Sequence, residues 1–144
     1  MSGHVIRVCP PRQFDFSELG DGGSGFVTVA ERIDCSQYQH ADLLVRVHTD
    51  ATFASGCSMS VVVVSDGFTT DDPSQDFFSA ALGQGGIIFN GSDPPTAGTL
   101  EVATYSSRLG AMLAVFVVGQ QAGTAPAPPS IQARLSIDLT LREC

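Results

Sequence analysis

Alternation of apolar and polar residues is the dominant pattern along this chain, and it is clearest in residues 131–142. Every odd-numbered position of this stretch is aliphatic, and every even-numbered position is polar or charged. Successive side chains of a β-strand point to opposite faces, so the period of two predicts a strand with one face on a core. The other face is predicted to meet water or a partner. The rest of the chain is expected to supply strands that pack against this one.

Further stretches have strand character, and they differ in the number of apolar faces. Residues 42–49 alternate, which predicts that Leu43, Val45 and Val47 face inward and that Arg46 and His48 face outward. Residues 59–64 and 111–119 are apolar on both faces, which is typical of a strand in the middle of a sheet or beneath a partner. The other predicted strands span residues 4–8, 26–32, 86–90 and 99–106.

Two proline-containing segments are predicted to interrupt the strands. Pro10 and Pro11 are expected to end the first strand, because proline cannot donate to a ladder. Residues 120–129 form a polar, proline-rich connection, interpreted as an exposed tip between the last two strands, which would then form a long hairpin. We expect this tip and the connection over residues 66–85 to form the contact surface, because both are long excursions from a rigid sandwich.

The connection over residues 66–85 holds the one helix that the sequence predicts. Asp72 can cap a helix that begins at Pro73, and Gln75 completes a capping-box pattern, which predicts a helix over residues 73–82. Several carboxylates in one connection also raise the alternative of a calcium site, although their spacing differs from that of an EF-hand. The aspartates concerned are Asp66, Asp71, Asp72 and Asp76.

Short strands, turn signals and at most one short helix predict an all-β fold, an antiparallel two-sheet β-sandwich. The chain of 144 residues is expected to form a single domain over residues 1–144. A jelly-roll-like sandwich is the preferred version, and an immunoglobulin-like sandwich is the second. The chain has no Trp, so the buried Trp of immunoglobulin domains is absent.

Charge and hydropathy narrow the classes of partner. The chain has 15 acidic residues against seven basic ones, all Arg, and this acidic balance argues against nucleic-acid binding. Charged residues make up 15% of the chain, against about 25% in an average soluble domain. A sparsely charged, Lys-free surface indicates either that partners cover much of it or that a GC-rich genome replaced Lys with Arg.

The sequence shows no targeting signal, so synthesis and folding in the cytoplasm are expected. No window approaches the roughly 20 apolar residues of a membrane span, so no membrane partner is expected. The first residues lack the apolar centre of a secretory signal.

Motifs for catalysis, cofactors or metals are few. Gly20, Gly22 and Gly25 have the G-x-G-x-x-G spacing, but a strand rather than a helix is predicted to follow, so a loop is expected there and no cofactor. The four cysteines, Cys9, Cys35, Cys57 and Cys144, include no C-x-x-C pair, which argues against zinc, and cytoplasmic folding favours free thiols.

Catalytic residues are not assigned. His4, His40 and His48 all lie in the first third of the chain, and no G-x-S-x-G motif is present. The protein is therefore expected to be no enzyme, and a Ser, His and Asp hydrolase is the least favoured of three functions.

Three segments carry a resemblance to a known group of proteins. Residues 33–48, the later residues 72–77 and the closing residues 133–141 resemble those of small β-sandwich structural proteins of tailed phages and phage-like particles. Proteins of that group decorate or cement a capsid shell or form part of a fibre. The resemblance implies no catalytic residues.

The expected function is therefore that of a structural subunit, a capsid decoration or cement protein or another virion-type assembly subunit. Its partner would be a capsid or particle shell, on a virion or a cytoplasmic particle, and it would form a homo-oligomer such as a trimer. The alternative is a carbohydrate- or ligand-binding β-sandwich module. Sugar sites usually stack rings on aromatic side chains, for which Tyr38 and Tyr105 are the Tyr residues present in this Trp-free chain.

Overall fold

The computed structural model describes residues 3–16, 23–35, 37–65, 80–81, 87–105, 112–121 and 131–143. Within these ranges every regular element is a β-strand, which confirms the predicted all-β class. The strands are β1 (Gly3–Phe16), β2 (Ser24–Asp34), β3 (His40–Val47), β4 (Thr52–Phe53), β5 (Cys57–Ser65), β6 (Ala80–Ala81), β7 (Ile87–Asn90), β8 (Leu100–Tyr105), β9 (Met112–Gln121) and β10 (Ile131–Arg142).

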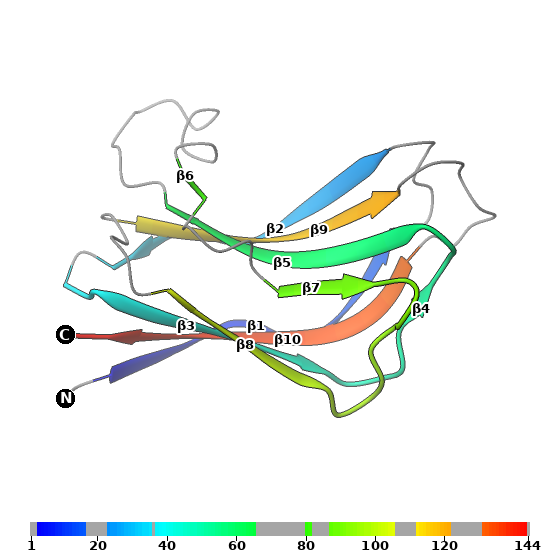
Figure 1. Cartoon of the computed structure of the whole chain (residues 1–144). Coiled ribbons are helices and arrows are strands. Elements are labelled where there is room, and N and C mark those ends of the chain that lie inside the picture. Colours follow the sequence, from blue (N-terminus) through cyan, green and yellow to red (C-terminus); the bar gives the residue numbers. More distant parts are fainter. Residues whose placement is uncertain are drawn as a thin grey trace.

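Two antiparallel sheets pack face to face, as predicted for a sandwich (Figure 1). The first, here called the β10 sheet, has the order β1-β10-β3-β8, and β4 also pairs with β10. The second, here called the β9 sheet, has the order β2-β9-β5-β6, and β7 also pairs with β5. Each sheet buries one face against the other and leaves the opposite face outward.

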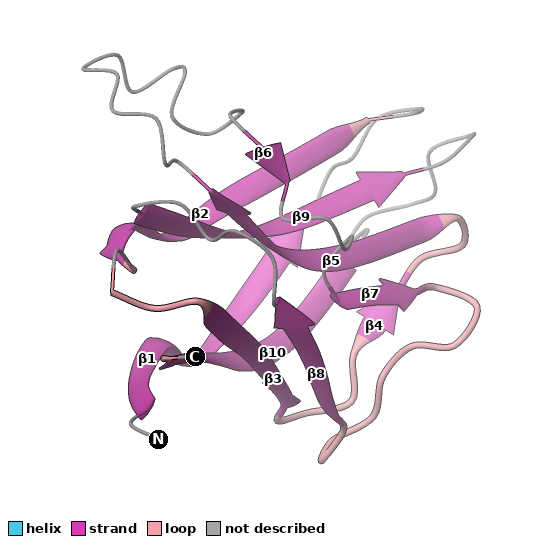
Figure 2. Ribbon diagram, turned by 60° about the vertical axis from the view of Figure 1, so that its left-hand side comes forward, coloured by secondary structure: helices cyan, strands magenta, loops and turns pink. Residues whose placement is uncertain are grey.

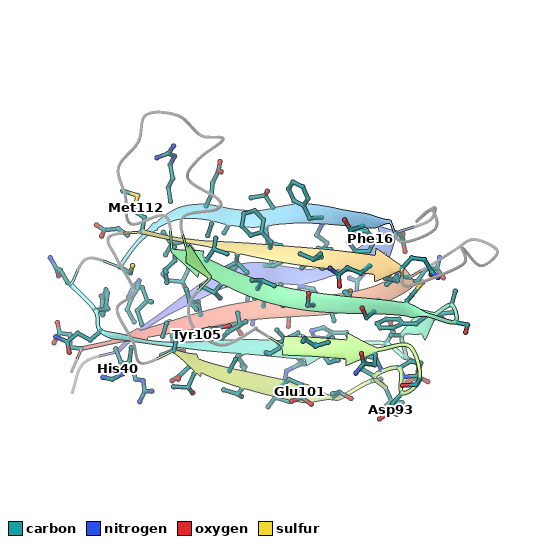
Figure 3. All side chains as sticks on the ribbon, turned by 45° about the horizontal axis from the view of Figure 1, so that its top comes forward. Phe16, His40, Asp93, Glu101, Tyr105 and Met112 are labelled. Carbon is teal, nitrogen blue, oxygen red and sulfur yellow. The ribbon has the colours of Figure 1, made fainter. Side chains whose placement is uncertain are left out.

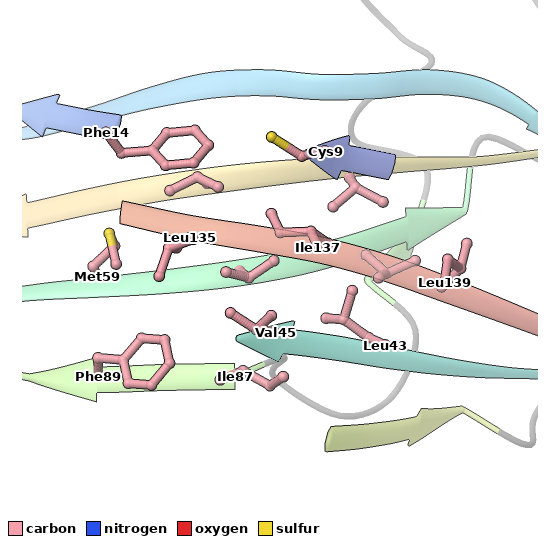
Figure 4. Close-up of a cluster of buried hydrophobic side chains, with 14 of the residues drawn as sticks. Cys9, Phe14, Leu43, Val45, Met59, Ile87, Phe89, Leu135, Ile137 and Leu139 are labelled. Carbon is pink, nitrogen blue, oxygen red and sulfur yellow. The ribbon is translucent and has the colours of Figure 1, made fainter. Parts of the chain in front are cut away.

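The strand predicted from the alternation of residues 131–142 is confirmed as β10 with the same limits. Its aliphatic side chains all point into the core, and each is at most 1% exposed. They pack between the sheets with inward side chains of β3, β5 and β7 (Figure 4). The inward residues of β10 are Ile131, Ala133, Leu135, Ile137, Leu139 and Leu141.

The two strands predicted to be apolar on both faces lie in the middle of one sheet, which confirms their expected position. β9 pairs with β2 on one side and with β5 on the other, and β5 pairs on its far side with β6 and β7. Their inward side chains include Met59, Val61 and Val63 of β5 and Leu113 and Val115 of β9, all at most 1% exposed.

The first strand is longer than predicted, because the two prolines do not end it. β1 continues through Pro10 and Pro11 to Phe16. It is an edge strand of the β10 sheet, and its register against β10 shifts between Arg7 and Cys9 and again between Cys9 and Arg12. An edge position and a bulge are the places where a strand tolerates proline, since a missing N–H costs no ladder bond there.

The predicted hairpin of the last two strands is wrong. β9 pairs with β2 and β5, whereas β10 pairs with β1, β3 and β4, so consecutive strands lie in different sheets. An apolar strand such as β9 is equally suited to either sheet, so the sequence pattern leaves its partner open.

The predicted helix over residues 73–82 is wrong at its end. Ala80 and Ala81 form β6, which pairs antiparallel with Ser65 and Val64 of β5. Residues 73–79 and 82 lie outside the described part of the chain.

Candidate functional site

The outward side of the β9 sheet is apolar, and its side chains come from paired positions of neighbouring strands. Phe26 of β2 stands opposite Val118 of β9, which stands opposite Ser60 of β5 and then Ile88 of β7. The next row contains Phe116, which pairs with Val62. We call this surface the apolar face and define it by Phe26, Val62, Val64, Ile88, Phe116 and Val118.

Part of the apolar face is packed and part is open. Val64 and Phe116 are 8% and 7% exposed and form a small cluster with Ala114, separate from the main core. Phe26 and Ile88 are 67% and 59% exposed. The rings of Phe26 and Phe116 meet edge to face at a centroid distance of 5.9 Å, a favoured aromatic geometry.

The rows that contain Phe26 and Phe116 carry no charged side chain among the described residues, whereas Asp34 stands opposite Met112 at the far end of β2 and β9. The row beside the Phe26 row consists of Ser24, Gln120, Ser58 and Asn90, which are polar but uncharged. Neighbouring uncharged rows that expose large apolar side chains are unusual for a surface that meets water, and exposed apolar patches of this kind mark interaction sites.

The outward side of the β10 sheet carries paired charges, beside the exposed apolar side chains of Val5, Leu100 and Val102. Arg7 Nε donates to Asp138 Oδ1 at 2.6 Å, and Arg142 forms an ion pair with Asp42 at 3.0 Å. Thr104 Oγ1 donates to the same Asp42 carboxylate at 2.9 Å. We call this surface the charged face and define it by Arg7, Asp42, Arg46, Arg134, Asp138 and Arg142. Two of its four Arg residues, Arg7 and Arg142, thus pair with its two Asp residues.

A groove of about 350 Å³ lies where β7 of one sheet approaches β8 of the other. Glu101 of β8 and Asp93 of the loop after β7 lie on the same side of the sandwich (Figure 3). The lining is rich in hydroxyl, amide and carboxylate groups, which are suited to a polar ligand. The lining residues are Ile88, Phe89, Asn90, Ser92, Asp93, Pro94, Pro95, Thr96, Thr99 and Glu101.

Glycine fixes the turn at one end of the groove. The Gly91 N–H donates to Cys57 O at 2.9 Å, and the Asp93 N–H donates to Asn90 O at 3.1 Å, which forms a turn at Asn90 and Gly91. A Cβ on residue 91 would lie 2.6 Å from Cys57 O, so a larger residue would displace the turn. The groove itself was not predicted from the sequence, although this turn and the prolines after it lie in its wall.

The histidines do not assemble a hydrolase site. His48 Nε2 lies 2.8 Å from Ser136 Oγ, whereas His4 and His40 lie at the opposite end of the β10 sheet, beside Leu141 and Arg142. Ser136 is 4% exposed in the middle of a strand, where a substrate has little access to its hydroxyl. The pair is better explained as a hydrogen bond that satisfies a buried hydroxyl.

The described cysteines, Cys9, Cys35 and Cys57, are all buried. Burial raises the pKa of the Cys9 thiol above its ordinary value, although Arg12 and Arg7 act in the opposite direction. A raised pKa keeps the thiol protonated and unreactive at neutral pH. Cys57 Sγ donates to Gln121 Oε1 at 2.7 Å.

Several sequence predictions fall on residues that the structure does not describe. They include the calcium alternative at Asp66, Asp71, Asp72 and Asp76, most of the proline-rich tip over residues 120–129, and Gly20 and Gly22. Across the described ranges, no cluster of three or more His, Cys, Asp or Glu residues is placed to hold a metal ion. The same ranges contain no helix with the length and apolarity needed to cross a bilayer.

Known proteins resemble this chain in fold rather than in sequence. No family model matches it, and no curated protein sequence matches it significantly. In a crystal structure of the infectious bursal disease virus VP2 subviral particle, 98% of this chain matches 32% of the VP2 chain, with 15% identity and a TM-score of 0.51. This chain thus spans about a third of the VP2 chain.

Other solved structures match more loosely. A structure of Desmodium yellow mottle tymovirus matches 99% of this chain and 83% of its own, with 17% identity and a TM-score of 0.34. The K3 cleaved adhesin domain of Lys-gingipain from Porphyromonas gingivalis matches 96% of this chain and 91% of its own, with 13% identity and a TM-score of 0.46. The match to VP2 supports a jelly-roll-like sandwich similar to a viral capsid-protein domain, whereas the finer likeness to phage proteins stays a prediction.

Proposed function

We propose that this chain is a non-enzymatic structural subunit of a virion-type particle, and that it attaches to the particle through the apolar face. The apolar face is the observation that carries the proposal, because Phe26 and Ile88 are 67% and 59% exposed among rows without charge. Leaving such a surface in water costs about 25 cal/mol for each Å² of apolar area. A protein partner that covers it would recover this free energy.

The finer role that we propose is capsid decoration or cement on a phage or phage-like shell, by a single β-sandwich domain of residues 1–144. The resemblance of residues 33–48 and 133–141 to such proteins supports it, as does the low share of charged residues, 15%. The subunit would act without a cofactor, as a symmetric homo-oligomer such as a trimer, on the virion or on a particle in the cytoplasm.

Co-sedimentation with particles from a lysate of the source tests this proposal. Phe26→Asp places a charge in the apolar face, and Val5→Asp is the matched control, because Val5 is 66% exposed on the outward side of the β10 sheet. We expect the wild type and Val5→Asp to sediment with particles and Phe26→Asp to stay in the supernatant. Circular dichroism should show the same fold for all three. Wild-type protein that sediments slowly, or Phe26→Asp that sediments like the wild type, would contradict the proposal.

A ligand-binding module is the second candidate, and the groove of about 350 Å³ favours it. Asp93 and Glu101 supply carboxylates that hydroxyl groups of a carbohydrate can meet. Tyr105 is 2% exposed, so its ring is not available to stack on a sugar. A glycan panel should therefore show binding that Glu101→Gln and Asp93→Asn weaken if this second function holds, and silence on the panel would remove it.

A further inference from the structure

The two edges of the β10 sheet differ in their protection against an additional strand (Figure 2). β1, at one edge, contains Pro10 and Pro11 and two register shifts, which are features that block edge-to-edge pairing. β8, at the other edge, pairs with β3 without a register shift and contains neither Pro nor Lys. Among the described strands, β3 is the only one that pairs with β8.

Backbone groups of β8 alternate between β3 and the open edge. The Val47 N–H donates to Thr99 O, and His48, the residue after β3, donates its N–H to Arg134 O of β10. Alternate residues of an antiparallel strand bond to opposite neighbours, so the even-numbered residues of β8 direct their N–H and C=O groups away from β3. These residues are Leu100, Val102 and Thr104.

The same even-numbered residues also place apolar side chains in water. Leu100 and Val102 are 46% and 54% exposed on the outward side of the β10 sheet. An edge strand that is regular, unguarded and partly apolar is a template for another extended strand.

We propose that β8 pairs with β8 of a second copy of this chain, antiparallel about a two-fold axis at Val102. In this register Val102 faces Val102 of the second copy, and Leu100 faces Thr104. All three residues have open-edge backbone groups, so the pairing forms six main-chain hydrogen bonds and joins the two β10 sheets into one. Apolar side chains would then face each other across the axis.

Other symmetric registers are less favourable. Moving the axis to Glu101 sets two carboxylates directly opposite each other, where like charges destabilise a sheet pair. Moving it to Ala103 leaves Leu100 without an opposite residue inside β8 and reduces the number of main-chain bonds. With the axis at Val102 the Glu101 side chains of the two copies stand diagonally, and each faces Ala103.

The β8 dimer goes beyond the proposed function, because it gives the homo-oligomer a two-fold axis and a contact strand, in place of the trimer named there as an example, and uses a different surface from the apolar face. Sedimentation equilibrium of the purified protein, up to about 1 mM, tests it directly. We expect a monomer–dimer equilibrium in which Val102→Lys raises the dissociation constant at least about tenfold, since it sets two cations opposite each other. Val5→Lys, on the guarded edge with 66% exposure, should leave the constant unchanged.

A wild type that stays monomeric over this range would overturn the proposal, and so would equal weakening by Val102→Lys and Val5→Lys. Phe26→Asp separates the two proposals. It should abolish co-sedimentation with particles and leave the dimer of the isolated protein intact.

Crosslinking tests the register. In a Cys144→Ser background, a short bifunctional maleimide should join Val102→Cys chains readily, because the two thiols meet at the axis. Leu100→Cys is the matched control on the same face, since its two copies would lie roughly 14 Å apart along the strands. Faster crosslinking of Leu100→Cys than of Val102→Cys would overturn the proposed register.

Discussion

The outward faces of the two sheets present different side chains to water. On the charged face, Arg7 with Asp138 and Arg142 with Asp42 form ion pairs across neighbouring strands, so polar groups meet polar groups and water. On the apolar face, Phe26 packs on Phe116 and remains 67% exposed. The inward faces of both sheets are buried in the shared core. The outward faces therefore offer a partner different contacts: an exposed ring on the β9 sheet, and ion pairs beside the exposed Leu100 and Val102 on the β10 sheet.

The largest expected difference lies within the apolar face. Phe116→Ala should lower the free energy of unfolding by about 3 kcal/mol, because its ring is 7% exposed and packed among Val64 and Ala114. Phe26→Ala should lower it by less than about 0.5 kcal/mol, because that ring is mostly in water. Urea unfolding of both variants measures the difference. Equal costs would show that Phe26 serves the fold rather than a partner.

The buried hydrogen bond of the charged face comes next in size. His48→Ala should cost about 1 to 2 kcal/mol, because it leaves the Ser136 hydroxyl, in a residue 4% exposed, without its bond at 2.8 Å. Combining it with Ser136→Ala removes the orphaned hydroxyl, so the double variant should be no less stable than His48→Ala. Urea unfolding of both single variants and the double variant measures this coupling. A double variant whose cost is the plain sum would contradict it.

Tyr105 is a core residue that belongs to neither outward face. Its hydroxyl is buried without a hydrogen-bond partner among the described residues, so Tyr105→Phe should raise stability by about 1 kcal/mol at pH 7. Burial raises the pKa of Tyr105 above that of the unfolded chain. Ionisation of Tyr105 therefore leaves the free energy of unfolding unchanged below about pH 10 and lowers it as the pH rises further, because the unfolded chain loses this proton more readily. Urea unfolding from pH 8 to 11 should show a smaller alkaline loss in Tyr105→Phe than in the wild type.

The smallest effect is expected for the surface ion pair of the charged face. The Arg7 and Asp138 side chains are 55% and 19% exposed, so solvent screens their interaction despite its length of 2.6 Å. A double-mutant cycle with Arg7→Ala and Asp138→Ala should give about 0.5 kcal/mol at low salt and less in 1 M salt. The stability cost of Phe116→Ala should change little with salt, and a coupling independent of salt would refute the ion-pair explanation.

Sequence alone predicted the strands better than their partners. The alternation in residues 131–142 predicted β10 with its limits and its buried side, because burial on one face imposes a period of two. The same logic cannot distinguish sheets for β9, whose two apolar faces are suited to any central position, and the expected hairpin with β10 was wrong. The strand end predicted at Pro10 and Pro11 was wrong, because a strand tolerates proline at the edge of a sheet, and the edge position is a property of the assembled sheet.

The candidate surfaces were predictable to a smaller extent. The two-sided apolar character of residues 59–64 and 111–119 already indicated a covered outer surface, which became the apolar face. The exposure of Leu100 and Val102 and the groove beside Glu101 depend on how β7 and β8 meet across the sheets. Contacts between segments that are distant in the sequence leave no local pattern, so the periodicity of apolar residues does not predict them.

The pairing of β1 with β10 also determines when the β10 sheet can form during synthesis on the ribosome. Gly3 stands opposite Arg142 and Phe16 opposite Ile131, so β1 pairs with a strand that is translated much later than itself. Until translation has delivered β10, β1 has no neighbour on either side, and the core has no central strand against which β3 can align. Such distant pairings are slow to form, because a long loop must close before any contact rewards it. The β10 sheet is therefore expected to form only after β10 has been translated, and slowing elongation before that point should do little to assist it.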